Sequence, residues 1–335
     1  MSIRIGINGF GRVGRLLARQ LLEQDDLTLS HVNDPAFTPE LAAHLLNVDS
    51  LDGAWKVLAE PTANGITARG HTISFSHERD IEAVGWGSKV DIVVDCSGRM
   101  KAAEQMQPYL RAGVKKAIVS APVTGAPNFV IGVNDHTYRP EQDHILSNAS
   151  CTTNCLATTA KVLHEVFTIK CGFITTIHAM TNDQSLLDEA HEDWRRARAA
   201  GISLIPTTSG FAKTIGSIIP DLAGHLQGYA VRAPVANASM IDAAFILASP
   251  ASTETINAAF GAAAGGKLKG ILGVETRPLV SADYRGDSRS AIIDTALTHV
   301  LDGHFAKVVA WYDNETGYVT RLRELTLKVA RSLQG

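Results

Sequence analysis

The sequence has few of the features that mark secreted, membrane or nucleic-acid-binding proteins. Its 335 residues include only 4 cysteines, none in a Cys-x-x-Cys pair, so neither a disulfide framework nor a metal site of zinc-finger spacing is expected. No apolar run approaches the roughly 18 residues of a membrane span, and no uninterrupted apolar segment follows the first residue. The formal net charge of -3 gives no general attraction for nucleic acid or anionic membranes. We therefore expect a cytoplasmic protein of two domains that binds neither nucleic acid nor membranes.

A glycine turn between a strand and a helix is the first motif present. An Ile-rich run over residues 3–7 is followed by Gly9-Phe10-Gly11-Arg12-Val13-Gly14 and then by apolar residues at helical spacing. A second apolar run, residues 27–32, leads to Asp34, about 20 residues beyond the turn. This order predicts that a pyrophosphate approaches the glycine backbone and that Asp34 accepts the ribose hydroxyls of NAD. The alternative is a glycine turn and a solvated aspartate in some other α/β domain.

Later apolar runs in the first half indicate further strands of the same sheet. They cover residues 92–95, 117–120 and 129–133, and each ends in small or polar residues that would line a cofactor crevice. A helix is expected over Met100–Ala112, and short strands with loops over residues 49–89. Arg79 lies in that irregular zone, where position alone favours a surface charge over a ligand.

The segment Ser147–Ala157 carries the strongest candidate for chemistry. Cys151 follows an apolar run and precedes a helix-like stretch, so it is expected at a helix N-terminus. Unpaired N–H groups and the positive end of the helix dipole would lower the pKa of its thiol, which makes Cys151 a candidate nucleophile. The alternative, that a cysteine here is a small buried apolar residue, fits Cys155 well because it lies one turn further in.

The second half changes to strand patterns with candidate charged ligands. A β-branched run over residues 171–177 leads to His178, a candidate base among 12 histidines. The basic cluster at residues 195–198 precedes a hydroxyl-rich turn at residues 206–210, and a solvated helix face and a phosphate cradle both fit it. Further runs predict strands at 227–235, 240–247, 292–301 and 307–312, and helices at 252–264 and 315–333. We thus predict an α/β chain: a Rossmann-type doubly wound parallel sheet, then an α+β domain with a mostly antiparallel sheet.

Together these motifs resemble those of the phosphorylating glyceraldehyde-3-phosphate dehydrogenase family over nearly the whole chain. The matching segments are Ile7–Arg12, Asn33-Asp34, Ser147–Ala157, Thr181–Gln184, Arg195–Ala200, Ile205–Thr208 and Trp311–Tyr318. The resemblance implies a NAD-binding Rossmann domain of residues 1–150 plus 315–335, a catalytic domain of residues 151–314, and a homotetramer.

The resemblance also implies roles for individual residues. Cys151 matches the nucleophile and His178 the base that activates it. The residues expected to contact the cofactor are Gly9, Gly11, Arg12, Val13, Asp34, Arg79, Ser120 and Asn314. The residues expected to hold the substrate phosphate and the attacking inorganic phosphate are Ser150, Thr152, Thr181, Arg196, Ser209, Gly210 and Arg232.

The implied reaction is the NAD-dependent oxidation of glyceraldehyde 3-phosphate to 1,3-bisphosphoglycerate through a hemithioacetal and a thioester on Cys151. The chain departs from the family pattern at Asp52, Met180, Ser209 and Glu189-Ala190. One alternative is therefore a specialised paralogue that uses arsenate as acceptor or erythrose 4-phosphate as substrate. Another, a regulatory or nucleic-acid-binding module with vestigial chemistry, does not explain why Cys151, His178 and the anion ligands occur together.

Overall fold

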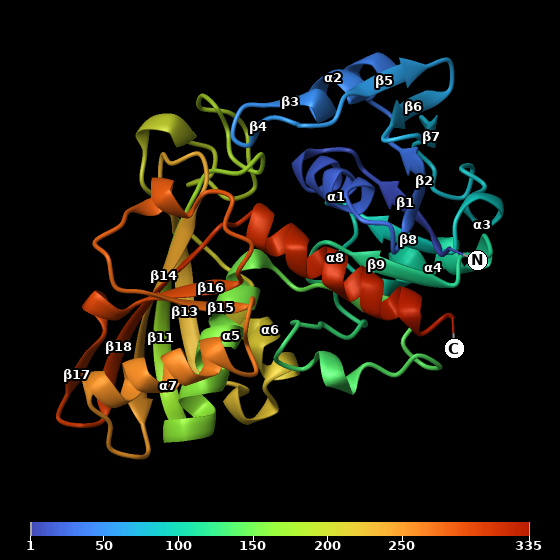
Figure 1. The fold of residues 1–335 in the computed structure, drawn as a ribbon. Helices are drawn as coiled ribbons and strands as arrows, with labels where there is room; N and C mark the ends of the chain where they lie inside the picture. Colours follow the sequence, from blue (N-terminus) through green and yellow to red (C-terminus); the bar gives the residue numbers. More distant parts are fainter. Residues whose placement is uncertain (1, 335) are drawn as a thin grey trace. The chain divides into compact units, whose positions relative to one another are not determined.

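Residues 2–334, which the computed structural model describes, form two units, each built on one large sheet (Figure 1). The first unit comprises the chain up to Phe129, Thr137–Ala149, and the chain from Val319 onward. The second comprises Val130–His136 and Ser150–Tyr318. In the described part of the chain, no helix is both long and apolar enough to cross a membrane.

The first unit contains a largely parallel eight-stranded sheet in the order β10-β9-β8-β1-β2-β7-β6-β5. Parallel pairing joins the strands from β10 to β7, whereas β6 and β5 extend the sheet by antiparallel hairpins. Their bounds are β1 Arg4–Asn8, β2 Thr28–Asn33, β5 Ala59–Thr62, β6 Gly65–Ala68, β7 His71–Ser76, β8 Ile92–Asp95, β9 Lys116–Val119 and β10 Ile145–Ser147. A separate short pair joins β3 (Val48–Asp49) and β4 (Gly53–Ala54). The predicted parallel sheet is confirmed.

The first unit also contains helices, and the first four named here contact strands of the sheet. They are α1 (Arg12–Leu22), α2 (Pro39–Asn47), α3 (Trp86–Lys89), α4 (Gln107–Arg111) and the part of α8 (Thr316–Arg331) from Val319 onward. Trp86 and Tyr109 are fully buried and pack with Val93 and Val119 of the sheet. Such large aromatic side chains contribute much of a core's apolar contact area.

The second unit contains a mixed sheet in the order β12-β13-β11-β14-β18-β16-β15, with β17 beside β18. The pairs β11–β13 and β15–β16 are parallel and the other pairs antiparallel, so the predicted mostly antiparallel sheet is confirmed. The strands are β11 Ile169–His178, β12 Ile205–Thr207, β13 Leu226–Arg232, β14 Ser239–Leu247, β15 Leu272–Glu275, β16 Ala291–Asp294, β17 His299–Leu301 and β18 Phe305–Tyr312.

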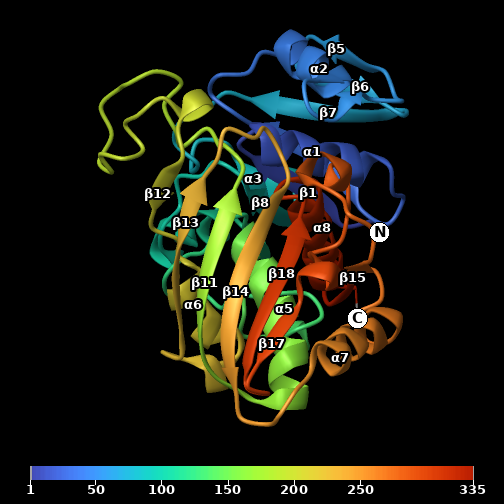
Figure 2. The same ribbon diagram turned by 90° about the vertical axis from the view of Figure 1, so that its left-hand side faces the viewer.

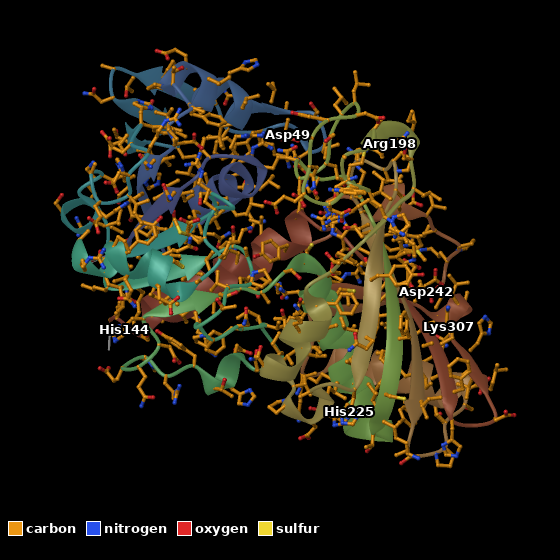
Figure 3. The ribbon with its side chains drawn as sticks, turned by 180° about the vertical axis from the view of Figure 1, so that it is seen from behind. Asp49, His144, Arg198, His225, Asp242 and Lys307 are labelled. Atoms are coloured by element: carbon orange, nitrogen blue, oxygen red, sulfur yellow. The ribbon has the colours of Figure 1, made fainter. Side chains whose placement is uncertain are left out.

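One face of this sheet is covered by helices and the other is open. Helix α5 (Cys151–Phe167) lies behind β11, β14 and β18 in Figure 2 and contacts these three strands. It also contacts the two neighbouring helices, α6 (Phe211–Ile218) and α7 (Thr253–Gly265). On the opposite face Phe173 and Tyr229 are exposed and their rings meet edge to face. Asp242 and Lys307, which are labelled in Figure 3, form an ion pair between β14 and β18.

Two predictions in the first half are wrong in detail. Residues 129–133 form a turn rather than a strand: the Val133 N–H donates to the Val130 carbonyl, and Gly132 has a positive φ of 83°. The strand at that edge of the sheet is β10, Ile145–Ser147. The helix expected over Met100–Ala112 is split into a 3₁₀ turn, Ala103–Met106, and α4, which begins just before Pro108. Proline is favoured in the first turn of a helix because the N–H that it lacks would have no carbonyl partner within the helix there.

The run at 292–301 is also interrupted. It forms β16, a 3₁₀ turn at Thr295–Leu297 and then β17. Other 3₁₀ turns lie at Asp135–Thr137, Ala200–Ile202, Pro220–Leu222 and Ser281–Tyr284.

The unit boundaries differ from the expected division at 150/151 and 314/315. Val130–His136 belongs to the second unit, where a Cβ added to Gly132 would lie 2.7 Å from the side chain of Ile271. Residues 315–318 also belong there, because the N–H groups of Glu315 and Thr316 donate to the carboxylate of Asp313. These close local contacts assign both segments to the second unit.

Candidate active site

Cys151 is the first residue of helix α5, as predicted. Strand β10 ends at Ser147, and Ser150 caps the helix by accepting a hydrogen bond from the Thr153 N–H at 3.1 Å. Serine is favoured at this position because its oxygen replaces a missing carbonyl acceptor at the helix start. The cap places the Cys151 side chain beside backbone N–H groups that point out of the helix.

His178 lies next to Cys151 in the second unit. The Cys151 Sγ is 3.4 Å from His178 Nε2, and His178 is the last residue of β11 with only 4% of its surface exposed. The residues that the resemblance implied as nucleophile and base thus lie within hydrogen-bonding distance of each other. A base within hydrogen-bonding reach of a thiol can remove the thiol proton.

Arg232 lies on the other side of the His178 ring. Strand β13 pairs with β11 in parallel, and their register places Arg232 directly opposite His178. The Arg232 Nη1 is 2.6 Å from His178 Nδ1 and 3.3 Å from the carbonyl oxygen of Ala179, which is itself 2.7 Å from Nδ1. A proton on Nδ1 can be donated to that carbonyl, and this tautomer leaves the Nε2 lone pair facing Sγ; Arg232, which can only donate, then bonds to the Ala179 carbonyl and not to Nδ1.

Burial and Arg232 together keep the His178 ring neutral. Burial, together with the adjacent Arg232 guanidinium that repels a second proton, lowers the pKa of His178 to about 3. Burial also raises the pKa of the Cys151 thiol, although Arg232 and the Thr152 N–H act in the opposite direction. The predicted lowering of the Cys151 pKa is therefore wrong in this structure, because loss of hydration outweighs the helix N-terminus. The resting pair is a neutral thiol beside a neutral base.

Tyr312 is a residue of this site that the sequence patterns did not single out. Its buried hydroxyl lies 3.0 Å from Thr152 Oγ1 and 2.9 Å from Thr176 Oγ1, and so connects the start of α5 to strand β11. Burial raises the pKa of Tyr312 well above its usual range, so the hydroxyl stays protonated. The sequence signals for this role are its place at the end of a strand and within the matching segment Trp311–Tyr318.

The expected anion ligands occupy two kinds of place. Ser150 and Thr152 flank Cys151, and Arg232 adjoins His178, as described above. Ser209 and Gly210 line an open groove of about 1030 Å³ at the start of α6, whose lining includes neither Cys151 nor His178. Among the described residues no hydrogen bond joins Thr181, Ser209 or Gly210 to the nucleophile or the base; the Thr181 N–H donates to Gln184 instead.

Arg196 is already engaged by carboxylates. Its guanidinium pairs with Asp183, lies 3.7 Å from Asp193 and donates to Thr207 Oγ1 at 2.8 Å. Its neighbour Arg198, labelled in Figure 3, is exposed and pairs with Asp188 at 3.0 Å. An anion that binds Arg196 would therefore compete with Asp183 for the same N–H groups.

A cavity of about 290 Å³ in the first unit is lined by four of the residues expected to bind the dinucleotide: Gly9, Gly11, Asp34 and Arg79. Gly9 has a φ of +94°, and a Cβ added there would lie 2.6 Å from the Ser97 backbone. A Cβ at Gly14 would lie 2.1 Å from the Gly9 carbonyl oxygen, whereas one at Gly11 would meet no atom within 4 Å. The turn is thus closely packed except at Gly11, where open space remains beside the helix N-terminus, as a pyrophosphate requires.

The carboxylate of Asp34 is held in place by backbone N–H groups. Phe10 donates to one of its oxygens at 2.7 Å and Ala36 to the other at 2.9 Å. Each carboxylate oxygen can accept more than one hydrogen bond, so Asp34 keeps acceptor capacity for ribose hydroxyls. These residues fit the dinucleotide that the sequence predicts.

The other expected cofactor residues have clear local positions. Arg12 begins α1 and pairs with Asp49 at 2.8 Å and with Asp52 at 3.5 Å, so the unusual Asp52 contributes to this cluster. Val13 follows Arg12 in the first turn, and the Ser120 N–H donates to the Asp95 carbonyl at the end of β9. Arg79 is exposed, as expected of a surface charge, and also lines the cavity. Asn314 belongs to the second unit, where its Oδ1 accepts a hydrogen bond from Ser239.

Comparison with known proteins gives two family matches and many full-length relatives. Residues 3–103 match the model described as glyceraldehyde 3-phosphate dehydrogenase, NAD binding domain, and residues 150–314 match the C-terminal domain of the same enzyme. Glyceraldehyde-3-phosphate dehydrogenase 3 of a Nostoc species is 49% identical, with 100% of each chain covered. The glyceraldehyde-3-phosphate dehydrogenase of Geobacillus stearothermophilus is 47% identical over 98% of this chain and 99% of the relative. Glyceraldehyde-3-phosphate dehydrogenase 1 of Bacillus subtilis is 43% identical over 99% of each.

Proposed function

The chain belongs to the glyceraldehyde-3-phosphate dehydrogenase family, and from this premise we propose that it oxidises glyceraldehyde 3-phosphate with NAD and inorganic phosphate to 1,3-bisphosphoglycerate. The observation that carries the proposal is the 3.4 Å approach of Cys151 Sγ to His178 Nε2 beside Arg232. We assign dinucleotide binding to the first unit and the covalent chemistry to the second.

The first step joins Cys151 to the aldehyde. As the Sγ–carbon bond forms, the thiol proton passes to His178 Nε2 and then to the aldehyde oxygen, which gives a hemithioacetal. Arg232 makes the protonated ring short-lived, because two cations lie side by side. His178 therefore returns its proton readily.

The second step oxidises the hemithioacetal. NAD, when bound, supplies the hydride acceptor. His178 Nε2 removes the hydroxyl proton as the carbon–hydrogen electron pair leaves, and the carbon–oxygen double bond of a thioester forms on Sγ. The neutral state of His178 suits this role, because a ring with a pKa of about 3 has its base form available at neutral pH.

The third step releases the product. An oxygen of inorganic phosphate attacks the thioester carbon, and the carbon–sulfur bond breaks to leave a thiolate on Cys151. The N–H groups at the start of α5 and the cation of Arg232 stabilise that negative charge, and the proton that His178 took up in the second step returns to Sγ and regenerates the thiol, while the proton of the attacking phosphate passes to the medium. The acyl phosphate conserves the energy of the oxidation.

We assign the remaining contacts as follows. Gly9, Gly11, Arg12 and Val13 surround the pyrophosphate, Asp34 binds a ribose, and Arg79, Ser120 and Asn314 complete the cofactor site. Ser150, Thr152, Thr181, Arg196, Ser209, Gly210 and Arg232 hold the substrate phosphate and the attacking phosphate. The negative charge of Asp34 favours NAD over NADP, whose 2′-phosphate it would repel.

We infer that the protein acts as a homotetramer in the cytoplasm. Phe173, Tyr229 and Phe305 are exposed on the open face of the second sheet. A further set of exposed apolar side chains comes from the segment after β11, namely Leu186, Leu187, Trp194, Ile202 and Leu204. Exposed apolar surface of this extent is typical of subunit contacts. The cytoplasm is the suitable compartment because the reaction requires a reduced Cys151 thiol.

The acceptor and aldehyde can be tested by NADH formation from purified protein. With glyceraldehyde 3-phosphate we expect a saturable dependence on phosphate, a similar response to arsenate because its geometry is close to that of phosphate, and little NADH beyond one turnover without either anion. Erythrose 4-phosphate should be the poorer substrate, in keeping with the names of the relatives. Equal rates with and without phosphate would contradict the proposed acceptor, and Cys151→Ser serves as the inactive control.

A further inference from the structure

The guanidinium of Arg196 is held on two sides by different kinds of partner. On one side its Nε donates to Thr207 Oγ1 at 2.8 Å, and its Nη2 donates to the Thr208 carbonyl at 3.2 Å. On the other side its Nη1 donates to the carboxylate of Asp183. These contacts use three of the five N–H groups that a guanidinium offers. The contact with Asp183 therefore uses a different N–H group from the contacts with Thr207 and Thr208.

The Thr207 side of this arrangement is a fixed part of the fold. Thr207 is the last residue of β12 and only 7% of its surface is exposed. Its hydroxyl accepts from Arg196 and donates its own proton to Asp193 Oδ2 at 2.5 Å, and the same Oδ2 lies 3.7 Å from Arg196 Nε. Because buried hydrogen bonds are costly to break, this side holds the guanidinium whether or not Asp183 contacts it.

The carboxylate of Asp183, in contrast, is loosely held. Its side chain is 54% exposed, whereas that of Arg196 is 16% exposed. Its second oxygen, Oδ1, lies 3.7 Å from His191 Nε2. Since His191 Nδ1 accepts the Asp193 N–H at 2.9 Å, a neutral His191 ring carries its proton on the nitrogen that faces Asp183. An ion pair with so exposed a carboxylate is weak, so Asp183 can leave Arg196 and keep its contacts with His191 and water.

The pair of Arg196 and Asp183 lies within electrostatic reach of the reactive residues. Burial is the main cause that lowers the pKa of Arg232; the charge of Arg196 acts in the same direction and that of Asp183 in the opposite one. Burial and Arg232 lower the pKa of His178, and Arg196 adds to their effect. Both charges of the pair therefore act close to the place where an anion must arrive to attack a thioester on Cys151.

We propose that Asp183 is an internal competitor for the anion position of Arg196 and thereby sets the affinity of the enzyme for inorganic phosphate. The inference rests on the proposed function, in which Arg196 helps to hold the phosphate that attacks the thioester. Phosphate carries more negative charge than a carboxylate and accepts charge-assisted hydrogen bonds from a guanidinium, so it can displace Asp183 from Nη1. The displaced carboxylate turns to His191 and water, while Thr207 keeps the guanidinium in place.

Two substitutions on opposite sides of Arg196 should change phosphate affinity in opposite directions. Asp183→Asn removes the competing charge at similar size, so the KM for phosphate should fall about two- to fivefold, the effect of one exposed ion pair. Thr207→Val keeps the β-branched shape but leaves Arg196 Nε without its acceptor, so the KM should rise about three- to tenfold. NADH formation by the full-length protein at constant ionic strength measures both. For Asp183→Asn the change should appear in the KM for phosphate and not in kcat.

A matched control separates direct competition from a general effect of charge. Asp188→Asn removes an equally exposed aspartate, which pairs with the exposed Arg198 at 3.0 Å, and should leave the KM for phosphate within about twofold. In an Arg196→Ala background, Asp183→Asn should cause no further fall, because the group for which it competes is absent. Titration of each NAD-free protein with inorganic phosphate, followed by phosphorus NMR, should give the same order of affinities without turnover.

A higher KM for phosphate in Asp183→Asn would show that the carboxylate supports Arg196 instead of competing with phosphate. An unchanged KM, or a fall that persists without Arg196, would equally overturn the inference. Failure of the proposed function has a different signature. If wild-type NADH formation does not depend on phosphate but the titrations show tighter phosphate binding by Asp183→Asn, the proposed acceptor is wrong and the competition stands. If the rate depends on phosphate but Asp183→Asn binds it as wild type does, only the competition is overturned.

Discussion

The environment of His178 decides what its imidazole can do. A histidine in water has a pKa near 6.5 and is partly charged at neutral pH, whereas burial and Arg232 lower the pKa of His178 to about 3. The ring is therefore a neutral acceptor, and the proton it takes from a thiol or hydroxyl is held only briefly. The same arginine that opposes ring protonation supports the thiolate on the other side of the site.

Replacing His178 tests this role directly. His178→Asn retains a polar side chain but offers no comparable base, so kcat should fall by about 10²- to 10⁴-fold, the usual contribution of general base catalysis. Steady-state NADH formation at saturating substrate measures the change. The exposed His299→Asn is the control and should keep kcat within about twofold. A similarly small effect at His178 would contradict its assignment as the base.

Helix starts and strand register place the reactive side chains. The cap at Ser150 starts α5 at Cys151, and the glycine turn before α1 brings that helix close to β1. Both features could be predicted from the sequence, because capping residues and glycine spacing act over a few neighbouring positions. In the first unit, Gly14 has a specific task, since any side chain there would contact the carbonyl of Gly9.

Two glycines of the turn should respond differently to the same added methyl group. Gly14→Ala places a Cβ where only 2.1 Å separates it from Gly9 O, so the first unit should lose about 1–3 kcal/mol of stability through overpacking. Gly11→Ala meets no atom within 4 Å and should retain its melting temperature but bind NAD more weakly. Thermal unfolding and NAD titration of both variants make the comparison. Equal destabilisation by the two would contradict this account of the turn.

What the sequence could not predict depends on residues far apart in the chain. His178 and Arg232 are 54 positions apart, and only the pairing of β11 with β13 shows that they adjoin. The Tyr312 hydroxyl likewise acquires its role from the order of strands. Residues 129–133 misled the prediction because an apolar run of that length can be a buried turn as well as a strand. The Cys151 pKa was misjudged because burial cannot be read from neighbouring residues.

Buried neutral histidines make the stability of the whole folded protein depend on pH. His31 is fully buried between Ser74 and Ser76, and burial lowers the pKa of His31 to about 4. His178 behaves in the same way. Below about pH 6.5 the unfolded chain therefore binds protons that the native chain does not, so the native state loses stability as the pH falls.

His31→Gln should make the stability of the protein less sensitive to acid. Each such histidine contributes a slope of up to about 1.4 kcal/mol per pH unit between the unfolded and folded pKa values. The variant should be less stable than wild type near neutral pH, because it loses two well-placed hydrogen bonds, yet lose less on acidification. Urea unfolding at about pH 7 and pH 5 measures the difference, with exposed His299→Gln as control. If the stability of His31→Gln fell with pH as steeply as that of the wild type, this role of His31 would be contradicted.

The pairing of β11 with β13 has a consequence for how the length of this chain can vary. The residues from Gly172 to His178 pair one by one with those from Leu226 to Arg232. The last of these pairs is His178, the base, with Arg232. A single residue inserted within either strand would shift the register and turn the following side chains to the other face of the sheet. Insertions and deletions should therefore be confined to the connection between the two strands, residues 179–225, while both strands keep a constant length.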